Sequence, residues 1–183
     1  GHFGVAGQAG PSEKELTLLT AQLLKSRLER YGAEVYLTRS SDTALVQDKR
    51  LQMVFSFNGD MLLSLHYNGV SYEEDGNRTY GIEGHYSNGF SQELAGVLTK
   101  NLAEDIGRIN RGTGHFYSSG IMETNLSPAV ELRLGYLTNP QEYEKSCNAF
   151  EMYQAVCSIA DTIVDYMDNL PANQQIKNSS GLP

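Results

Sequence analysis

The sequence predicts a single α/β domain over residues 1–170, with a mostly parallel twisted sheet flanked by helices. Segments with a helical spacing of apolar residues alternate along the chain with short apolar runs, which is typical of parallel sheets. The length of 183 residues suits one domain. Hydrophobic residues form 40% of the chain and charged residues 20%, which is enough apolar surface for an ordinary globular core.

The first predicted helix runs from Glu13 to about Tyr31. Ser12 and Glu15 fit a capping box at its start, and Gly32 is a typical stop signal after its end. One face of the helix is expected to carry its leucines: Leu16, Leu19, Leu23, Leu24 and Leu28. Further helical patterns cover residues 42–57, 91–106 and 141–167.

Short apolar runs predict the strands, at residues 33–38, 60–66, 80–86 and 128–134. In the second run, residues 61–63 (MLL) are continuously apolar, as in a strand that is buried on both faces. The polar residues 71–79 indicate a surface loop. The polar residues 171–183 predict a disordered tail.

The charge and the cysteines limit the classes of partner. A net charge of −8 and a pI near 4.9 argue against a nucleic-acid partner and against electrostatic docking on anionic lipid. No run approaches the length of a membrane span, and no signal peptide is visible. Cys147 and Cys157 lie ten positions apart in one helical pattern, too far for a disulfide, so we expect both in the core.

Three side chains have the chemistry of a metal site. His66 closes an apolar strand, and ligands of open α/β sheets gather beyond the carboxyl ends of strands. His2 lies in a glycine-rich loop, and Glu13 lies in the first turn of the helix that follows. Two imidazoles and one carboxylate form a common catalytic zinc set that leaves a position for water. Glu15 is the competing carboxylate, but a capping box would turn it back onto the helix start.

A series of motifs in a fixed order runs through nearly the whole chain. The motifs are residues 1–4 (GHFG), 12–15 (SEKE), 32–39 (GAEVYLTR), 64–68 (SLHYN), 81–86 (GIEGHY), 128–130 (PAV) and 135–140 (GYLTNP). Together they resemble the zinc-dependent N-acetylmuramoyl-L-alanine amidase family of bacterial cell-wall hydrolases, in its type 3 catalytic domain.

The resemblance implies a cofactor, a substrate and a location. His2, Glu13 and His66 would hold Zn²⁺ at the carboxyl edge of the sheet. The substrate would be peptidoglycan, cut at the amide bond between N-acetylmuramic acid and L-alanine of the stem peptide. The expected chemistry is attack by zinc-activated water, with a glutamate as general base and then acid. Such a protein would act as a monomer outside the cytoplasm, in the periplasm or cell wall.

The chain departs from the family pattern at the glutamate. The family's last block reads like PAVLVEVGF, whereas residues 128–136 read PAVELRLGY, so Arg133 occupies the catalytic glutamate's position. An arginine cannot act as a base near pH 7. Glu131 points to the same side, about 6.6 Å further back. Glu131 and Arg133 could be a structural ion pair, or Glu131 or Glu83 could supply the base. Arg133 could also stabilise an oxyanion.

A second departure concerns the sheet. The family has an apolar strand just before the Gly-His loop, and this sequence begins at Gly1 without one. In the family sheet that strand is internal, so its loss would expose two strand edges. We therefore expect that the sequence is a fragment or omits this strand.

Three further residues are candidates for substrate binding. Asn68 either orients substrate or ties the loop after His66. Glu83 and His85 share a strand face, where His85 has either a role near the substrate or a packing role. His115 is expected in a loop at the rim of the cleft.

Three functions are compatible with these motifs. The first is an active zinc amidase on peptidoglycan. The second is a weak or inactive amidase-like module that binds cell wall or protein, which only the substitution at Arg133 favours. The third is another zinc peptidase on the same scaffold, for which the sequence offers nothing beyond the metal chemistry.

Overall fold

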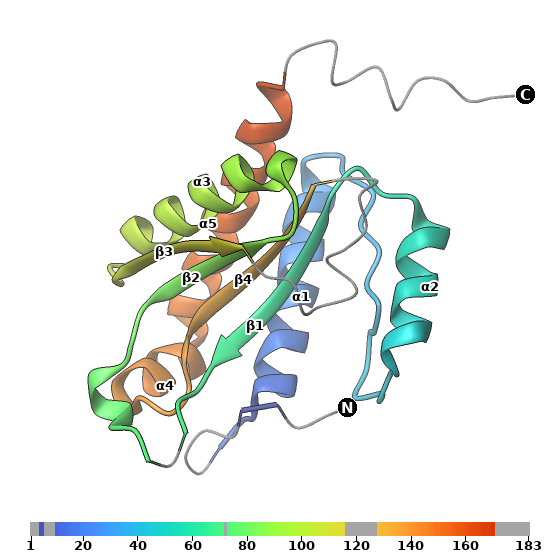
Figure 1. Ribbon diagram of the computed structural model, residues 1–183. Coiled ribbons are helices and arrows are strands. Elements are labelled where there is room, and N and C mark those ends of the chain that lie inside the picture. The colour runs from blue at the N-terminus through green and yellow to red at the C-terminus, as the bar shows by residue number, and fades with distance from the viewer. Residues whose placement is uncertain (1–3, 6–9, 72, 116–127, 171–183) are drawn as a thin grey trace, which may run out of the picture.

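The computed structural model of the protein describes residues 4–5, 10–71, 73–115 and 128–170 (Figure 1). Its α-helices are α1 (Glu13–Arg30), α2 (Gln47–Phe57), α3 (Gly89–Asp105), α4 (Pro140–Cys147) and α5 (Ala149–Asp168). Its strands are β1 (Leu62–Asn68), β2 (Ile82–Tyr86), β3 (Asn110–His115) and β4 (Ala129–Tyr136), with a short 3₁₀ helix η1 (Gly76–Arg78). The predicted tail lies outside the described residues.

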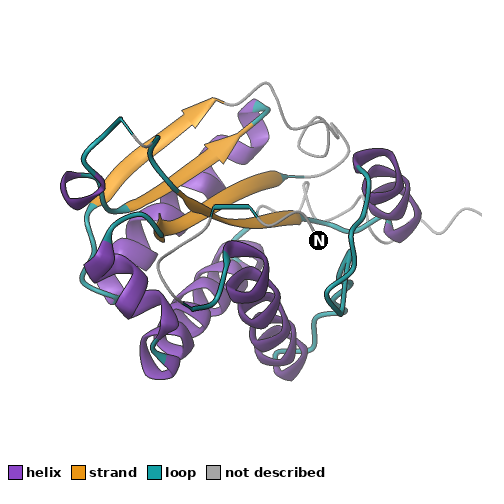
Figure 2. Cartoon of the chain, turned by 90° about the horizontal axis from the view of Figure 1, so that it is seen from below, coloured by secondary structure: helices purple, strands orange, loops and turns teal. Residues whose placement is uncertain are grey.

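The four strands form one mixed sheet in the order β1-β4-β2-β3. The pairs β1/β4 and β2/β3 are parallel, and β4/β2 is antiparallel. Helices α1 and α3 both pack against α5, and Figure 2 shows the helices gathered largely on one side of the sheet. The prediction of a single α/β domain with a mostly parallel sheet is confirmed.

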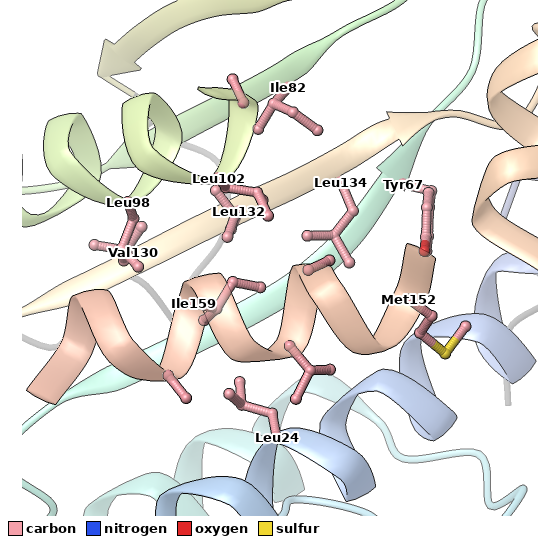
Figure 3. Packing of buried hydrophobic residues seen from close by; sticks show 14 of the residues in the cluster. Leu24, Tyr67, Ile82, Leu98, Leu102, Val130, Leu132, Leu134, Met152 and Ile159 are labelled. Carbon is pink, nitrogen blue, oxygen red and sulfur yellow. The ribbon is translucent and has the colours of Figure 1, made fainter. Parts of the chain in front are cut away.

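The core lies between the sheet and these helices. Val130, Leu132 and Leu134 alternate along β4 and point toward α5, where Ile159 meets them (Figure 3). Leu98 and Leu102 of α3 close the same core. Complete burial of a leucine or isoleucine stabilises the fold by about 1.5–3 kcal/mol relative to an exposed one.

The other face of the sheet is polar over β1, β4 and β2. The register pairs its residues directly across neighbouring strands, so their side chains project to one side. We call these six residues the polar face: Ser64, His66, Glu83, His85, Glu131 and Arg133. Alternation along each strand thus places apolar side chains on the face that packs against the helices and titratable or polar side chains on the opposite face.

The predicted strand at residues 33–38 is wrong. This segment has no strand pairing among the described residues, and β1 has one edge that no described strand pairs with. A cavity of about 1030 Å³ lies along that edge, with Val35 and Leu37 among its lining. A segment with strand-like composition forms a strand only where a neighbouring strand supplies the ladder hydrogen bonds. Here residues 33–38 and β1 face each other across the cavity, so no such hydrogen bonds form between them.

Other expectations failed at element ends and surfaces. Helix α2 begins at Gln47, whereas the expected cap Asp42 instead accepts a hydrogen bond from Lys14 at 2.6 Å. Strand β3 was not predicted, and His115 is its last residue. Leu19 is 47% exposed, Cys147 is exposed at the end of α4, and Cys157 is only partly buried, so neither cysteine belongs to the core as expected. Periodicity locates a helix better than it locates the helix ends.

Candidate active site

The first turn of α1 directs Glu13 and Glu15 to different places, as predicted. The backbone N–H and the hydroxyl of Ser12 donate to the Glu15 carboxylate at 2.9 and 2.7 Å. This capping box turns Glu15 back onto the helix start. Glu13, two residues earlier, is left to project toward the end of β1, where its side chain is largely buried.

Glu13 and His66 meet at the carboxyl end of β1. The Oε1 atom of Glu13 lies 3.0 Å from Nδ1 of His66. The same carboxylate accepts the backbone N–H groups of Val5 at 2.7 Å and of Tyr67 at 3.2 Å. Burial alone would raise the pKa of the Glu13 carboxyl, but the hydrogen bonds from His66 and from the two backbone N–H groups lower it overall. Glu13 is therefore held as a carboxylate.

The glycine-rich loop passes directly over Glu13. Gly4 has a φ of +63°, and a Cβ atom there would lie 2.1 Å from Oε2 of Glu13. Only glycine fits both the backbone conformation and the space. The loop that carries His2 therefore approaches the carboxylate at Gly4, although His2 itself lies outside the described residues.

The two described donors fit a zinc ion by their chemistry. Imidazole nitrogen and carboxylate oxygen are ordinary zinc ligands. The Nε2 atom of His66 lies 3.1 Å from the Ser64 hydroxyl, so a neighbour orients the ring while Nδ1 faces Glu13. Within the described residues, no group of three or more potential ligands gathers. Completion of the set thus depends on His2, and the three-ligand assignment stays a prediction.

Arg133 and Glu131 form an ion pair beside these ligands. Nε of Arg133 donates to Glu131 at 2.9 Å, and Nη1 donates to Oδ1 of Asn68 at 2.6 Å. Glu131 is 4% exposed. Arg133 is the direct register partner of His66 on the neighbouring strand. The pairing of Glu131 with Arg133, one of the two alternatives from the sequence, is thus present.

Glu83 lies at the centre of a second hydrogen-bonded group. It accepts from Asn68 at 3.0 Å, from Nε of Arg111 at 2.6 Å, and from the Tyr136 hydroxyl. Its distance to Nε2 of His85 is 3.5 Å. The interaction with His85, followed by those with Tyr136, Arg111 and Asn68, outweighs burial and lowers the pKa of Glu83 well below its usual value. Burial and the bond to Glu83 raise the pKa of Tyr136 to about 12.

Asn68 joins the two groups, because it donates to Glu83 and accepts from Arg133. Asn68 was expected either to orient substrate or to hold the loop after His66. In the structure it links side chains of the polar face to each other instead of holding a loop. Sequence reasoning missed Arg111 and Tyr136. Tyr136 lies in the last family block, whereas nothing in the pattern around Arg111 marks it as a neighbour of Glu83.

The cavity along β1 reaches this site. Its lining includes Gly4, Glu13 and His66, together with Glu131 and Arg133 on the neighbouring strand. The candidate ligands and the unusual ion pair therefore border one common space.

In this α/β domain, a carboxylate–imidazole pair with the donor chemistry of a metal site lies at the carboxyl end of a strand, where open α/β sheets bind their ligands. Comparison with known proteins makes the class specific. The chain belongs to the N-acetylmuramoyl-L-alanine amidase family, whose match covers residues 1–165.

Two curated relatives illustrate the similarity. The probable cell wall amidase LytH of Staphylococcus saprophyticus is 34% identical over 131 residues, which are 71% of this chain and 41% of that protein. The N-acetylmuramoyl-L-alanine amidase LytC of Bacillus subtilis is 30% identical over 160 residues, 86% of this chain and 32% of that protein. The chain thus spans less than half the length of these relatives.

Solved structures share the fold. An N-acetylmuramoyl-L-alanine amidase from Clostridium difficile 630 superimposes with a TM-score of 0.85 at 26% identity, over 93% of each chain. The catalytic domain of CwlV from Bacillus (Paenibacillus) polymyxa var. colistinus gives 0.82 at 28% identity, over 91% of each chain. Among the described residues of this chain, no helix combines the length and the apolarity needed to cross a membrane.

Proposed function

We propose that this chain binds zinc through His2, Glu13 and His66 and hydrolyses the amide bond between N-acetylmuramic acid and L-alanine in peptidoglycan. The observation that carries the proposal is the contact between Glu13 and His66 at 3.0 Å, built from two separate family motifs. We further propose that the protein acts as a monomer outside the cytoplasm, where its substrate lies.

Zinc, when bound, would supply an activated water and polarise the carbonyl of the scissile amide. The protein's own groups would hold and orient the reacting parts. The backbone donors of Val5 and Tyr67 fix the Glu13 carboxylate, and the hydroxyl of Ser64 fixes the His66 ring. Asn68, Glu83 and His85 would contact the substrate from the neighbouring part of the polar face.

The base is the weak part of this site. Glu83 has a lowered pKa and several donors, so it is a poor proton acceptor. We infer that Glu131 supplies what base function remains, and that its burial and its bond to Arg133 restrict it. General acid–base catalysis typically contributes about 10²–10⁴-fold, so a rate reduced by a factor within this range is expected.

A second candidate is a non-catalytic module that keeps the fold and binds cell wall. The observation that favours it is the ion pair itself, because Arg133 is fixed by both Glu131 and Asn68 at the position of the family glutamate. In that case the polar face would recognise peptidoglycan without cleaving it.

The release of soluble stem peptides from purified sacculi distinguishes the two functions. Zinc-loaded protein should release fragments slowly, whereas metal-stripped protein and Glu13→Gln should release none. The double variant Glu131→Leu/Arg133→Glu restores the family pattern and should raise the rate by about 10²–10⁴-fold. Absence of release by the parent and by this double variant would favour the binding module.

A further inference from the structure

Two ion pairs with the same orientation lie at the polar face, one within it and one that joins Glu83 to Arg111 of the neighbouring strand β3. In the pair of Arg133 and Glu131, the arginine side chain is 25% exposed and the carboxylate side chain 5%. In the pair of Arg111 and Glu83, the corresponding values are 39% and 18%. In both pairs the cation lies outward and the anion inward. A ligand that approaches this face therefore meets guanidinium groups first, in a chain whose net charge is −8.

The inner carboxylates are engaged by their neighbours. Glu83 accepts from Asn68 and Tyr136 in addition to Arg111, and Glu131 is almost fully buried under Arg133. Buried and hydrogen-bonded anions repel a ligand at the surface less than exposed ones, because exposed charges act on the solvent side directly. A ligand at the surface therefore experiences a more positive electrostatic potential at this face than the formal charges of its residues alone would give.

Both guanidinium groups are held in place before any ligand arrives. Arg133 is fixed by Glu131 and Asn68. Arg111 lies over the ring of Tyr136 at 5.3 Å from its centroid and bonds Glu83. A fixed planar guanidinium is suited to a carboxylate, since its donors match the two oxygens and less entropy is lost on binding.

The placement connects this pair to the candidate metal ligands. Arg133 is the register partner of His66 on β1 and of Glu83 on β2. Arg111 reaches the same Glu83 from β3. The two arginines therefore flank one carboxylate on the sheet face, directly beside the end of β1.

Hydrolysis of the muramyl amide changes which charges a ligand carries. Water adds to the carbonyl, the C–N bond breaks and a C–O bond forms. The lactyl group stays on the sugar and becomes a carboxylate, and the L-alanine nitrogen leaves as a free amine that takes up a proton. The uncut lactyl amide is neutral, so the new carboxylate is the group that an arginine would select. A glutamate at position 133 would instead repel it.

We propose that Arg133 and Arg111 form a recognition site for the carboxylate of a muropeptide fragment, which makes this chain retain cleaved rather than uncleaved cell-wall material. The inference rests on the proposed function, because it takes the ligand from that reaction. Two carboxylates could bind by the same chemistry. The lactyl carboxylate is created by the cut and would give the preference for cleaved material, whereas the stem-peptide carboxylates are present before the cut and would not.

Calorimetric titration of the full chain at low ionic strength tests the proposal. The ligands are N-acetylmuramic acid and its neutral lactyl amide, and an L-alanyl peptide with either a free or an amidated carboxyl terminus. Each is titrated into zinc-loaded and into zinc-stripped protein. We expect the acid to bind at least about tenfold more tightly than its amide, because only the acid can form hydrogen bonds between two charged groups with the arginines. The glycan and peptide arms identify the source of the carboxylate.

Variants assign the effect to the arginines. The double variant Glu131→Gln/Arg133→Gln leaves no stranded charge and should lose the preference for the acid, as should Arg111→Gln in part. Glu131→Gln alone should tighten binding of the acid, because it removes the compensating anion but keeps the arginine. The matched control is Arg78→Gln, whose arginine is 87% exposed and pairs with Asp75 away from the sheet. It should bind like the parent.

Equal affinity for acid and amide overturns the proposal, and so does an unchanged preference in the double variant. Neither result bears on hydrolysis, which the release of stem peptides from sacculi measures separately. Binding that depends on the arginines, without any release, would refute the proposed hydrolysis and leave the recognition site standing.

Discussion

The replacement Arg133→Gln should destabilise the fold, because it strands the buried carboxylate of Glu131. The pair is joined at 2.9 Å, and the carboxylate side chain is only 5% exposed. Removal of one partner from a buried pair costs about 3–5 kcal/mol. Arg133 is 25% exposed, so solvent weakens the attraction, and we expect about 2–4 kcal/mol. For a domain of this size, that lowers the melting temperature by about 4–16 °C.

Urea denaturation of four proteins measures this effect: the parent, Arg133→Gln, Glu131→Gln, and the double variant. The double variant lacks both charges, so it should recover most of the loss and give a coupling energy of about 1–3 kcal/mol. Two results would refute the reasoning. One is a single variant within about 0.5 kcal/mol of the parent, as at an ordinary surface site. The other is a double variant as unstable as the sum of the singles.

Three further predictions follow from the same geometry. Elemental analysis should show about one zinc per chain, with large losses in Glu13→Ala and His66→Ala but none in Glu15→Ala; unchanged zinc in the first two would disprove the assignment. The pKa of Glu83 is lower in the folded protein than its unfolded value near 4.5. Ionised Glu83 therefore stabilises the fold at pH values above 4.5, and this stabilisation is lost as the pH falls toward the folded pKa. The unfolding free energies of the parent and of Glu83→Gln should therefore converge on acidification, and a constant difference would contradict this. We also propose that the cavity beside β1 takes an apolar strand, so a chain extended before Gly1 by such a strand should melt at a higher temperature than one extended by a polar segment of equal length.

The sequence predicted the elements that are governed by local patterns. The capping box at Ser12 is formed by short-range hydrogen bonds, so it could be read from four residues, and it correctly separated Glu13 from Glu15. The two-residue spacing of Glu131 and Arg133 likewise placed both side chains on one side of their strand, where the structure pairs them.

The failures occurred where distant neighbours decide the structure. Residues 33–38 have strand composition, but a strand needs a pairing partner that local pattern cannot supply. Strand β3 contains Gly112 and Gly114, which disfavour strands in isolation, and it forms because β2 lies beside it. Arg111 could not be assigned to Glu83 because the contact joins residues 28 positions apart.

The contact between Glu13 and His66 was predictable from the sequence, whereas the hydrogen-bond network beside it was not. Family motifs pointed to Glu13 and His66, and the structure brings both together. The tie from Glu83 through Asn68 to Arg133 depends on side-chain rotamers across three strands, which no spacing rule encodes. The sequence therefore left the roles of Glu131 and Arg133 open, and the structure resolved their pairing.

The most direct test of the central claim is to identify the bond that is cut. Purified peptidoglycan is incubated with the zinc-loaded protein, and the products are analysed by mass spectrometry together with labelling of new amino termini. The expected products are stem peptides with a free L-alanine amine and glycan strands with free lactyl carboxylates, both absent with metal-stripped protein. Products with new sugar reducing ends, or peptides cut within the stem, would contradict it.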